Sequence, residues 1–508
     1  MATRSLSSTI TNSYSFSNMN INEKEWVESM RKSVVEYEEE SEENPVCIFS
    51  VPQVLLATDP ESYIPQQVAL GPFHHWRPEV YDMQRYKLAA ARRTQKFMNV
   101  SFERIVEIMK KNDEARIRAC YHKSIDMSGD ALIWMMAVDM AFLLEFLQVY
   151  SIKEEGRTLK KVKSMMSHVV DVTGKKLSHM VILRDVVMVE NQIPMFLIHT
   201  MLKHQIKNTN DEDKSADETL KSMLMGLYIE LAPFQEKVLP DVDINDCDHL
   251  LDFLYHMTVP NNKELGITEI ISNIPLLKLM KEPMERMLEK FQGGGEEKSE
   301  EEGGELKAPT IEEITIPSVT DMAQAGILIS PVYGGISDIS FDNITSTLYL
   351  PVVDLDVNTE VYLRNLVAYE ACVAAGPLVV ARYTELMNGI VDTEEDAKFL
   401  RERGVILNHL KSDKEVADLW NGMSKSVKLT KVPKMDKVIE DVNKRYAQTW
   451  KVKFANFMNT YVFGSWKFLT VLVAIVMLLL TALQSFCSVY SCARMFHQLP
   501  DFQGGTTD

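Results

Sequence analysis

The sequence lacks the short motifs that mark the common nucleotide-binding, hydrolase and zinc-protease classes. It contains no GxxxxGKS/T, GxGxxG, GxSxG or HExxH pattern, and its glycine triplet at 293–295 lies in an acidic insert. Each of these motifs positions a phosphate, a nucleophile or a metal. Their absence disfavours an enzyme of a familiar type, and we predict no catalytic residue, no cofactor and no resident metal.

Cysteine is scarce as well. The chain of 508 residues has six cysteines, scattered along the sequence and without a CxxC pair. Disulfide-dependent proteins are usually small, secreted and much richer in cysteine. The pattern therefore indicates a reduced intracellular chain.

An overall excess of positive charge is also missing, since the net charge is −18. Proteins that bind nucleic acid neutralise phosphates with Lys and Arg. We therefore expect no nucleic-acid partner, and the same balance disfavours general adhesion to anionic lipid.

The N-terminus has no apolar core of the kind found in a cleavable signal peptide. Its first 20 residues are rich in Ser and Thr and carry the single basic residue Arg4. We expect residues 1–43 to be a disordered arm with a short amphipathic helix around Trp26, followed by an acidic run at 36–43.

From residue 44 the pattern predicts a helical body, whose first half is 44–292. Prolines between Pro52 and Pro78 exclude a long helix before about residue 80. A helical stretch at 83–110 is expected to turn these residues inward: Tyr86, Leu88, Ala90, Phe97, Ile105 and Ile108. Residues 132–150, apolar nearly all round, predict a central buried helix. The apolar segment 180–203 is expected to kink or divide at Pro194.

Residues 293–307 read as an acidic Gly-rich linker, and 308–440 as the second half of the helical domain. Between 325 and 356, β-branched alternation interrupted by Pro and Gly predicts two to four short strands in hairpins. Helices are expected to resume at 359–374, 381–389, 394–404 and 413–424. The fold class is thus mainly α, a multi-helical globular body with a small β-hairpin insertion, intertwined as one domain.

The C-terminal region predicts a membrane anchor. Residues 441–467 carry aromatic and basic side chains at helical spacing, and 468–490 are 23 residues without a formal charge. We expect an aromatic and basic juxtamembrane helix, one transmembrane helix at 468–490 and a short tail at 491–508. Three lysines precede the apolar segment and Arg494 follows it, which predicts a single-pass, tail-anchored protein with its bulk in the cytosol.

Histidines provide the best candidates for metal ligands. His249, Asp252 and His256 share one helical face, so that a divalent ion is conceivable. The favoured alternative is that the two histidines cap or pair while the neighbouring leucines pack. His74 and His75 follow Gly-Pro in a turn, where ring stacking or backbone hydrogen bonding is favoured over metal binding.

An acidic alternation resembles the start of a calcium loop without completing it. It consists of Asp354, Asp356, Asn358 and Glu360. The positions that need Gly and Glu hold Thr359 and Asn365, so the EF-hand pattern fails. Asn358 or Thr359 is expected to cap the following helix instead.

Four carboxylates stand in very apolar surroundings: Asp139, Glu145, Asp185 and Glu190. Buried carboxylates can serve acid–base chemistry, although pairing is the commoner use. Arg184 or Arg118 is expected as the partner. Glu190, Asn191 and Gln192 are expected to satisfy backbone groups freed at the Pro194 break.

Several blocks in one order resemble a plant family known as domain of unknown function 247. They are VPQVLLATDPESYIPQQVALGPFHH at 51–75, RACYH at 118–122, RDVVMVENQIPMFL at 184–197, IPSVTDMAQAGI at 316–327 and LPVVDLDVNTEVYLRNLVAYE at 350–370. The resemblance runs from about residue 46 to 492. It implies a mostly helical land-plant protein that ends in a transmembrane helix and has no established activity. Some grass members belong to self-incompatibility loci.

Three functional hypotheses remain open. The first is a membrane-anchored interaction or recognition scaffold with unidentified protein partners. The second is a membrane-bound enzyme of unrecognised type that uses the buried carboxylates or His249 and His256. The third is a cell-recognition component with its body outside the cell, which predicts glycans on the sequons at Asn99 and Asn343.

Overall fold

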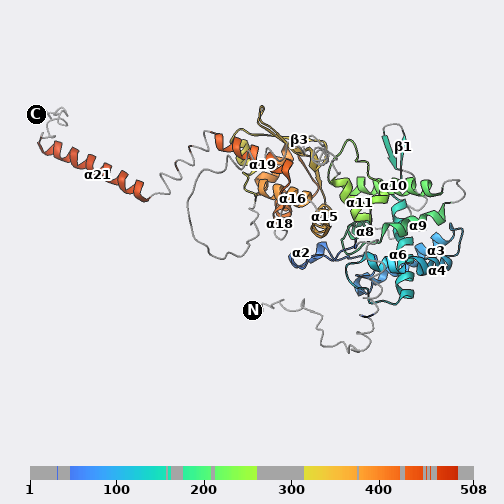
Figure 1. Ribbon diagram of the computed structural model, residues 1–508. Coiled ribbons are helices and arrows are strands. Elements are labelled where there is room, and N and C mark those ends of the chain that lie inside the picture. Colours follow the sequence, from blue (N-terminus) through green and yellow to red (C-terminus); the bar gives the residue numbers. More distant parts are fainter. Residues whose placement is uncertain are drawn as a thin grey trace, which may run out of the picture. The chain divides into compact units, whose positions relative to one another are not determined.

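The computed structural model describes residues 46–155, 158–161, 176–206, 212–259, 314–373, 377–423, 430–449 and 466–489, together with the isolated positions 31, 454 and 458. The described chain is mostly helical with a few short strands, as the sequence predicted (Figure 1). It divides into two compact units. Unit 1 takes the described residues of Met1–Ala232, Leu239–Met284 and Asn358–Ala375, and unit 2 takes those of Pro233–Val238, Glu285–Val357 and Gly376–Asp508.

Unit 1 is a helical assembly with one small hairpin. Its elements are α2 (Gln53–Thr58), η2 (Pro60–Ser62), η3 (Pro78–Met83), α3 (Gln84–Gln95), α4 (Phe102–Asn112), α5 (Glu114–Cys120), α6 (Gly129–Gln148), β1 (Ile152–Glu155), β2 (Thr158–Lys161), α8 (Lys176–Val186), α9 (Met195–Gln205), α10 (Glu212–Leu231), η4 (Ile244–Asp246), α11 (Leu250–Thr258) and α15 (Thr359–Val373). Strands β1 and β2 pair antiparallel.

Helix α6 is the centre of this unit, as its apolar sequence predicted. Helices α3, α4 and α9 all pack on it (Figure 1). Its N-terminus is capped by Ser128, whose Oγ accepts the amide hydrogen of Ala131 at 3.3 Å. Fourteen of its residues are buried, and Asp139 and Glu145 are among them.

The predicted break at Pro194 is confirmed. Helix α8 ends at Val186 and α9 begins at Met195, directly after the proline. Proline carries no amide hydrogen and disfavours helical backbone at the residue before it. The chain therefore turns between the two helices, through residues 187–194.

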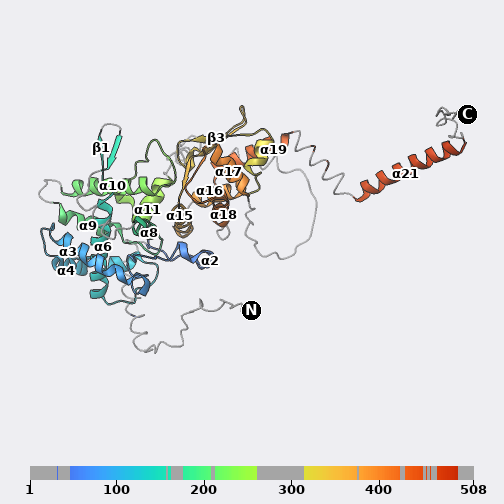
Figure 2. The same cartoon turned by 180° about the vertical axis from the view of Figure 1, so that it is seen from behind.

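Unit 2 combines short strands with helices. Its elements are α14 (Val319–Gln324), β3 (Leu328–Val332), η6 (Ile336–Asp338), β4 (Ser340–Asp342), β5 (Thr347–Pro351), β6 (Val353–Leu355), α16 (Val379–Ile390), α17 (Glu394–Glu402), β7 (Ile406–Asn408), α18 (Asp413–Met423), α19 (Pro433–Gln448) and α21 (Trp466–Val489). Helix α18 packs against both α16 and α17 (Figure 2). Trp420 of α18 is fully buried, with its ring edge-on to Tyr383 of α16 at 5.9 Å.

The strands differ from the expected hairpins. Strand β5 lies between β3, to which it is parallel, and β4, to which it is antiparallel. Strand β6 pairs in parallel with β7, which follows more than 50 residues later. Of these pairs, only β4–β5 is a hairpin of neighbouring antiparallel strands. The two parallel pairs cannot be hairpins, because parallel pairing needs a longer connection.

Only part of the set expected to point inward does so, since Ala90 and Ile105 are buried. Tyr86, Leu88 and Phe97 are 39%, 47% and 46% exposed, and the buried face of α3 is formed by Lys87, Ala90, Ala91 and Thr94. The stretch predicted as one helix over 83–110 is two, α3 and α4, with Ser101 capping the second. The spacing of apolar residues predicted the wrong buried face for α3, because the face that is buried includes a lysine.

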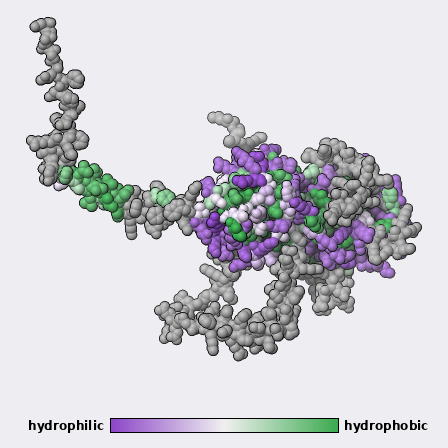
Figure 3. Space-filling view, turned by 90° about the horizontal axis from the view of Figure 1, so that it is seen from above, coloured by the Kyte–Doolittle hydropathy of each residue, from purple (hydrophilic) through white to green (hydrophobic). Residues whose placement is uncertain are grey.

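The prediction of a transmembrane helix at 468–490 is wrong. Among the described residues, no helix has the combined length and apolarity needed to cross a membrane. Helix α21 covers this region, and its described side chains, at 470–486, are exposed and mostly apolar (Figure 3). The expectation of a single-pass tail anchor is wrong with it, whereas the membrane partner and the cytosolic location stay predictions.

Some predicted segments lie wholly or largely outside the described residues. They are the N-terminal arm at 1–43, the acidic linker at 293–307 and the tail at 491–508. Most of the predicted juxtamembrane helix at 441–467 also lies outside them, and α19 occupies only its start, ending at Gln448.

Candidate functional site

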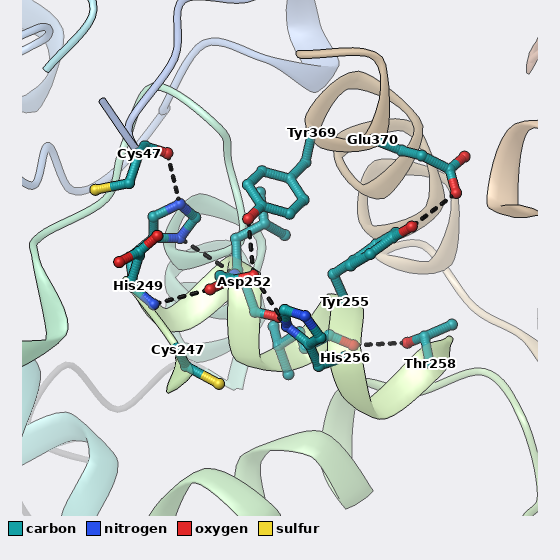
Figure 4. A network of polar contacts seen from close by, with 12 residues as sticks. Cys47, Cys247, His249, Asp252, Tyr255, His256, Thr258, Tyr369 and Glu370 are labelled. Carbon is teal, nitrogen blue, oxygen red and sulfur yellow. Dashed lines mark hydrogen bonds and ion pairs between the residues drawn. The ribbon is translucent and has the colours of Figure 1, made fainter. Parts of the chain in front are cut away.

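The polar network around helix α11 brings together two histidines, a carboxylate, a thiol and two phenols of unit 1 (Figure 4). His249 precedes the helix with an extended backbone, φ −159° and ψ 178°. Its Nδ1 accepts the amide hydrogen of Asp252 at 3.2 Å, which makes it the N-cap. Its Nε2 therefore carries the ring hydrogen and donates to the carbonyl of Cys47 at 3.0 Å. Burial lowers the pKa of His249, so the ring is neutral with both nitrogens engaged.

Asp252 is held by donors from three directions. Tyr369 Oη donates to its Oδ1 at 2.7 Å, and the amide of Asp248 donates to its Oδ2 at 2.8 Å. His256 Nδ1 lies 3.0 Å from Oδ1. Burial alone would raise the pKa of Asp252, but the hydrogen bond from His256 and the other donors lower it. The same hydrogen bond raises the pKa of His256, whose side chain is 31% exposed.

Cys247 completes a cluster with these two residues. One ligand atom each from Cys247, Asp252 and His256 lie within 4.8 Å of one another. The thiol donates weakly to the carbonyl of Asp243 at 3.5 Å. Burial and the nearby carboxylates raise the pKa of Cys247 to about 12, so it is a thiol at neutral pH.

The metal-ligand set considered from the sequence is thus only partly assembled. His249 takes the capping role that was its favoured alternative, while Asp252 and His256 stay together. The third potential ligand beside Asp252 and His256 is Cys247 and not His249. The signal for it is the turn η4, which ends just before Cys247 and brings the thiol back against the first turns of α11. Helical spacing could not predict that Cys247 lies beside Asp252, because Cys247 precedes the helix.

A pocket of about 230 Å³ adjoins the cluster at Cys247. Its lining includes Arg116, Phe196, His199, Cys247 and Asp248. The Arg116 guanidinium lies 3.8 Å from the centre of the Phe196 ring, and His199 Nε2 lies 2.5 Å from Asp217 Oδ1. The pocket therefore presents charges of both signs beside an aromatic wall.

The other histidine pair from the sequence serves local structure. His74 Nε2 lies 3.2 Å from Glu190 Oε2, and His75 packs edge-on to Trp76 at 4.7 Å. Glu190 also accepts the amide hydrogen of Val51 at 3.0 Å. His75 thus has the ring stacking that was one favoured alternative, whereas His74 pairs with the Glu190 carboxylate, which was not expected.

Two of the buried carboxylates form ion pairs with helix α3. Lys87 Nζ lies 2.6 Å from Asp139 Oδ1, and Arg93 meets Glu145 through a two-pronged contact at 2.8–3.1 Å. The expected partners were different. Arg118 pairs with Glu114 at 3.0 Å instead.

Asp185 and the residues after it stabilise the turn at Pro194. Asp185 accepts three amide hydrogens, from Gln66, Gln67 and Val68, at 2.6–3.0 Å. The Gln192 amide donates to the carbonyls of Val186 and Met188, each at 2.8 Å. The Asn191 amide donates to the carbonyls of Val68 and Asp185 at 3.0 and 2.9 Å. The expectation that these side chains satisfy backbone freed at the helix break is confirmed for Asn191 and Gln192 but not for Glu190, which accepts from Val51.

The acidic alternation near 354–360 does not form a calcium loop. Asp354 pairs with His409 at 3.1 Å, and Glu360 pairs with Arg364 at 2.7 Å. Helix α15 begins at Thr359, and Asn358 occupies the capping position because its carbonyl accepts the amide hydrogen of Tyr362. The sequon residues Asn99 and Asn343 are both exposed, and glycosylation at them stays a prediction.

Comparison with known proteins places the chain in a family. The model of a family described as "plant protein of unknown function" matches residues 48–480. UPF0481 protein At3g02645 of Arabidopsis thaliana is 40% identical over 529 aligned positions, covering 93% of this chain and 96% of the relative. UPF0481 protein At3g47200 of the same plant is 22% identical over 466 positions, covering 88% of this chain and 86% of the relative. No solved structure matches the chain. The chain therefore belongs to this plant family of unknown function, domain of unknown function 247.

Proposed function

We propose that the protein is an interaction module that binds an acidic segment of a protein partner on an exposed face of helix α3. The observation that supports this is a row of side chains, here called the α3 stripe: Tyr81 of η3, then Arg85, Leu88 and Arg92 of α3, and Lys96 at its C-cap. From Arg85 onward, successive members are spaced by three or four residues, so they share one helical face. All five are exposed, Tyr81 by 64% and Leu88 by 47%.

The charge of the α3 stripe favours an acidic occupant. The chain carries a net charge of −18, yet residues 77–123 hold twelve Lys and Arg against six Asp and Glu. Within the described part of the chain, Arg85, Arg92 and Lys96 form no ion pair with a carboxylate. Arginine clusters with adjacent apolar groups are a recurrent means of recognising acidic motifs.

The buried carboxylates support binding over catalysis. Asp139, Glu145 and Asp185 are each engaged by a cation or by backbone amides that stabilise the fold. A general acid or base needs a lone pair or proton directed at a substrate. The oxygen lone pairs of these three carboxylates are instead directed at donors within the protein.

A displayed library of random peptides tests the proposal. The wild-type chain should enrich sequences in which Asp and Glu flank an apolar residue, and binding should weaken as salt is raised. Leu88→Ala combined with Arg92→Glu should abolish that enrichment. The matched control is Ile344→Ala combined with Lys414→Glu, which alters an exposed apolar residue and an exposed cation of unit 2.

The control should enrich the same peptides as the wild-type chain. If the wild-type chain selects no acidic sequences, or if the α3 variant selects them equally well, the proposal is wrong. Melting temperatures of both variants, compared with that of the wild-type chain, verify that each is folded.

A further inference from the structure

We propose that Cys247, Asp252 and His256 form a binding site for a zinc-class transition metal ion, with its remaining coordination position directed to the adjoining pocket. The three side chains supply one sulfur, one oxygen and one nitrogen ligand. Such a mixed set suits Zn²⁺ and Co²⁺, whereas Mg²⁺ and Ca²⁺ prefer oxygen ligands throughout.

The spacing of the ligand atoms is close to what such an ion requires. Zinc lies about 2.0–2.3 Å from its ligands, which places tetrahedral ligand atoms about 3.4 Å apart. His256 Nδ1 and Asp252 Oδ1 are already 3.0 Å apart, and all three ligand atoms lie within 4.8 Å of one another. The widest separation therefore exceeds the tetrahedral spacing by up to about 1.4 Å, which a movement of the thiol would close.

The surrounding hydrogen bonds orient the carboxylate ligand. Tyr369 Oη and the Asp248 amide hold the two oxygens of Asp252, and His249 Nδ1 accepts the Asp252 amide hydrogen (Figure 4). Outer groups of this kind fix ligand direction in metal sites. Asp252 is 3% exposed, so its position is set before an ion arrives.

An ion also has a way in and an open position. The His256 side chain is 31% exposed, and Cys247 lines the pocket of about 230 Å³. Three protein ligands leave a fourth position, which water or a donor group of a small molecule in the pocket would take. On binding, the Cys247 thiol and His256 Nδ1 each lose their proton to solvent, the hydrogen bond from His256 to Asp252 breaks, and sulfur and nitrogen bind the ion with no change of oxidation state.

Cobalt(II) titration of the full chain, kept reduced with a phosphine, tests the site. The wild-type chain should take up one Co²⁺ with a thiolate-to-cobalt charge-transfer absorption. Cys247→Ser should remove that absorption, and His256→Gln should weaken uptake at least tenfold. Cys372→Ser is the matched control, because Cys372 is another thiol of unit 1 whose pKa is raised by burial. It should behave like the wild-type chain.

A second measurement on the wild-type chain covers the case in which a variant does not fold. Alkylation with iodoacetamide, mapped by mass spectrometry with and without Zn²⁺, should show protection of Cys247 but not of Cys372. Equal labelling of Cys247 in both conditions would overturn the proposal. Two other results would also overturn it. One is a charge-transfer absorption that persists in Cys247→Ser, and the other is a failure of the wild-type chain to take up Co²⁺ to saturation.

Discussion

The phenol of Tyr369 donates a hydrogen bond to Asp252 across 2.7 Å, and this contact joins helices α15 and α11 within unit 1. The two residues are 117 positions apart in the sequence, and both are buried. Burial together with the Asp252 charge raises the pKa of Tyr369 far above its usual range, so the phenol remains a donor at every ordinary pH. The contact is a long-range restraint on a charged acceptor.

Removing this hydroxyl should destabilise unit 1 measurably. Tyr369→Phe keeps the ring but leaves Asp252 without one donor, and a hydrogen bond to a charged group contributes about 1.5–3 kcal/mol. Urea denaturation followed by tryptophan fluorescence measures the loss. Tyr86→Phe, at a 39% exposed position of α3, is the control and should change the free energy of unfolding by less than about 0.5 kcal/mol. Equal effects of the two substitutions would mean that the Tyr369 bond contributes nothing.

The buried pair of Lys87 and Asp139 should behave as one unit. Each side chain is 1% exposed, and Lys87 also donates to the carbonyl of Ala69. Lys87→Met alone leaves an uncompensated buried carboxylate and should cost about 3–5 kcal/mol of stability. Asp139→Leu in the same chain should restore a large part of that loss, because no buried charge then remains. A double-mutant cycle in urea measures the coupling, and simple additivity of the two losses would contradict this account.

Asp185 should make stability depend on pH in the direction opposite to most paired carboxylates. Burial raises its pKa to about 6, although three backbone amides favour the charged form. A carboxyl group with a raised folded-state pKa binds its proton more tightly when folded. Its contribution is therefore complete below about pH 4 and is lost as the pH rises through about 6, up to about 3 kcal/mol.

The measurement compares wild-type chain with Asp185→Asn, which does not titrate. The free energy of unfolding of the wild-type chain, minus that of the variant, should fall between pH 4.5 and 7.5. Loss of amide hydrogen bonds in the variant shifts this difference by a constant amount and leaves its slope unchanged. A difference that rises with pH would show that the amides of Gln66, Gln67 and Val68 outweigh burial.

Local signals explain the parts of the fold that the sequence predicts well. The apolar run of α6 and the backbone chemistry of Pro194 act within a few residues, so a helix and a break follow directly. Pairing across long distances leaves no such signal. The parallel pairs β3–β5 and β6–β7 depend on how the intervening chain returns, and β7 was not predicted at all.

The error on α3 and the change in the candidate metal set have different physical origins. Sequence patterns treat charged residues as solvent-facing, yet Lys87 is buried by its contact with Asp139 and thereby turns Leu88 to the surface. By contrast, the set of His249, Asp252 and His256 followed from helical spacing. The structure gives His249 to the helix cap and moves Cys247 beside Asp252 through a turn. The outcome on α3 depends on a partner 52 positions away, whereas the outcome at the site depends on a turn that directly precedes α11.

Gly71 provides a test of close packing that is independent of charge. Its φ of +71° already disfavours a side chain, and a Cβ there would lie 2.8 Å from Tyr121 Oη and 2.9 Å from the carbonyl oxygen of Gln192. Those two atoms are themselves hydrogen-bonded at 2.9 Å, so neither can move without breaking that bond. Gly404 has nearly the same φ, +74°, but no atom within 4 Å of a Cβ.

The pair separates backbone strain from steric overlap. Gly404→Ala should cost about 1–2 kcal/mol, the penalty for a side chain in left-handed backbone. Gly71→Ala should cost about 1–3 kcal/mol more, the usual range for overpacking. Because the two glycines lie in different units, the readout is hydrogen exchange of amides in the unit that carries each substitution. Amides around Tyr121 and Gln192 should exchange faster in Gly71→Ala, since the methyl group forces their hydrogen bond apart. Equal acceleration in the two variants would mean that the neighbours of Gly71 yield without cost.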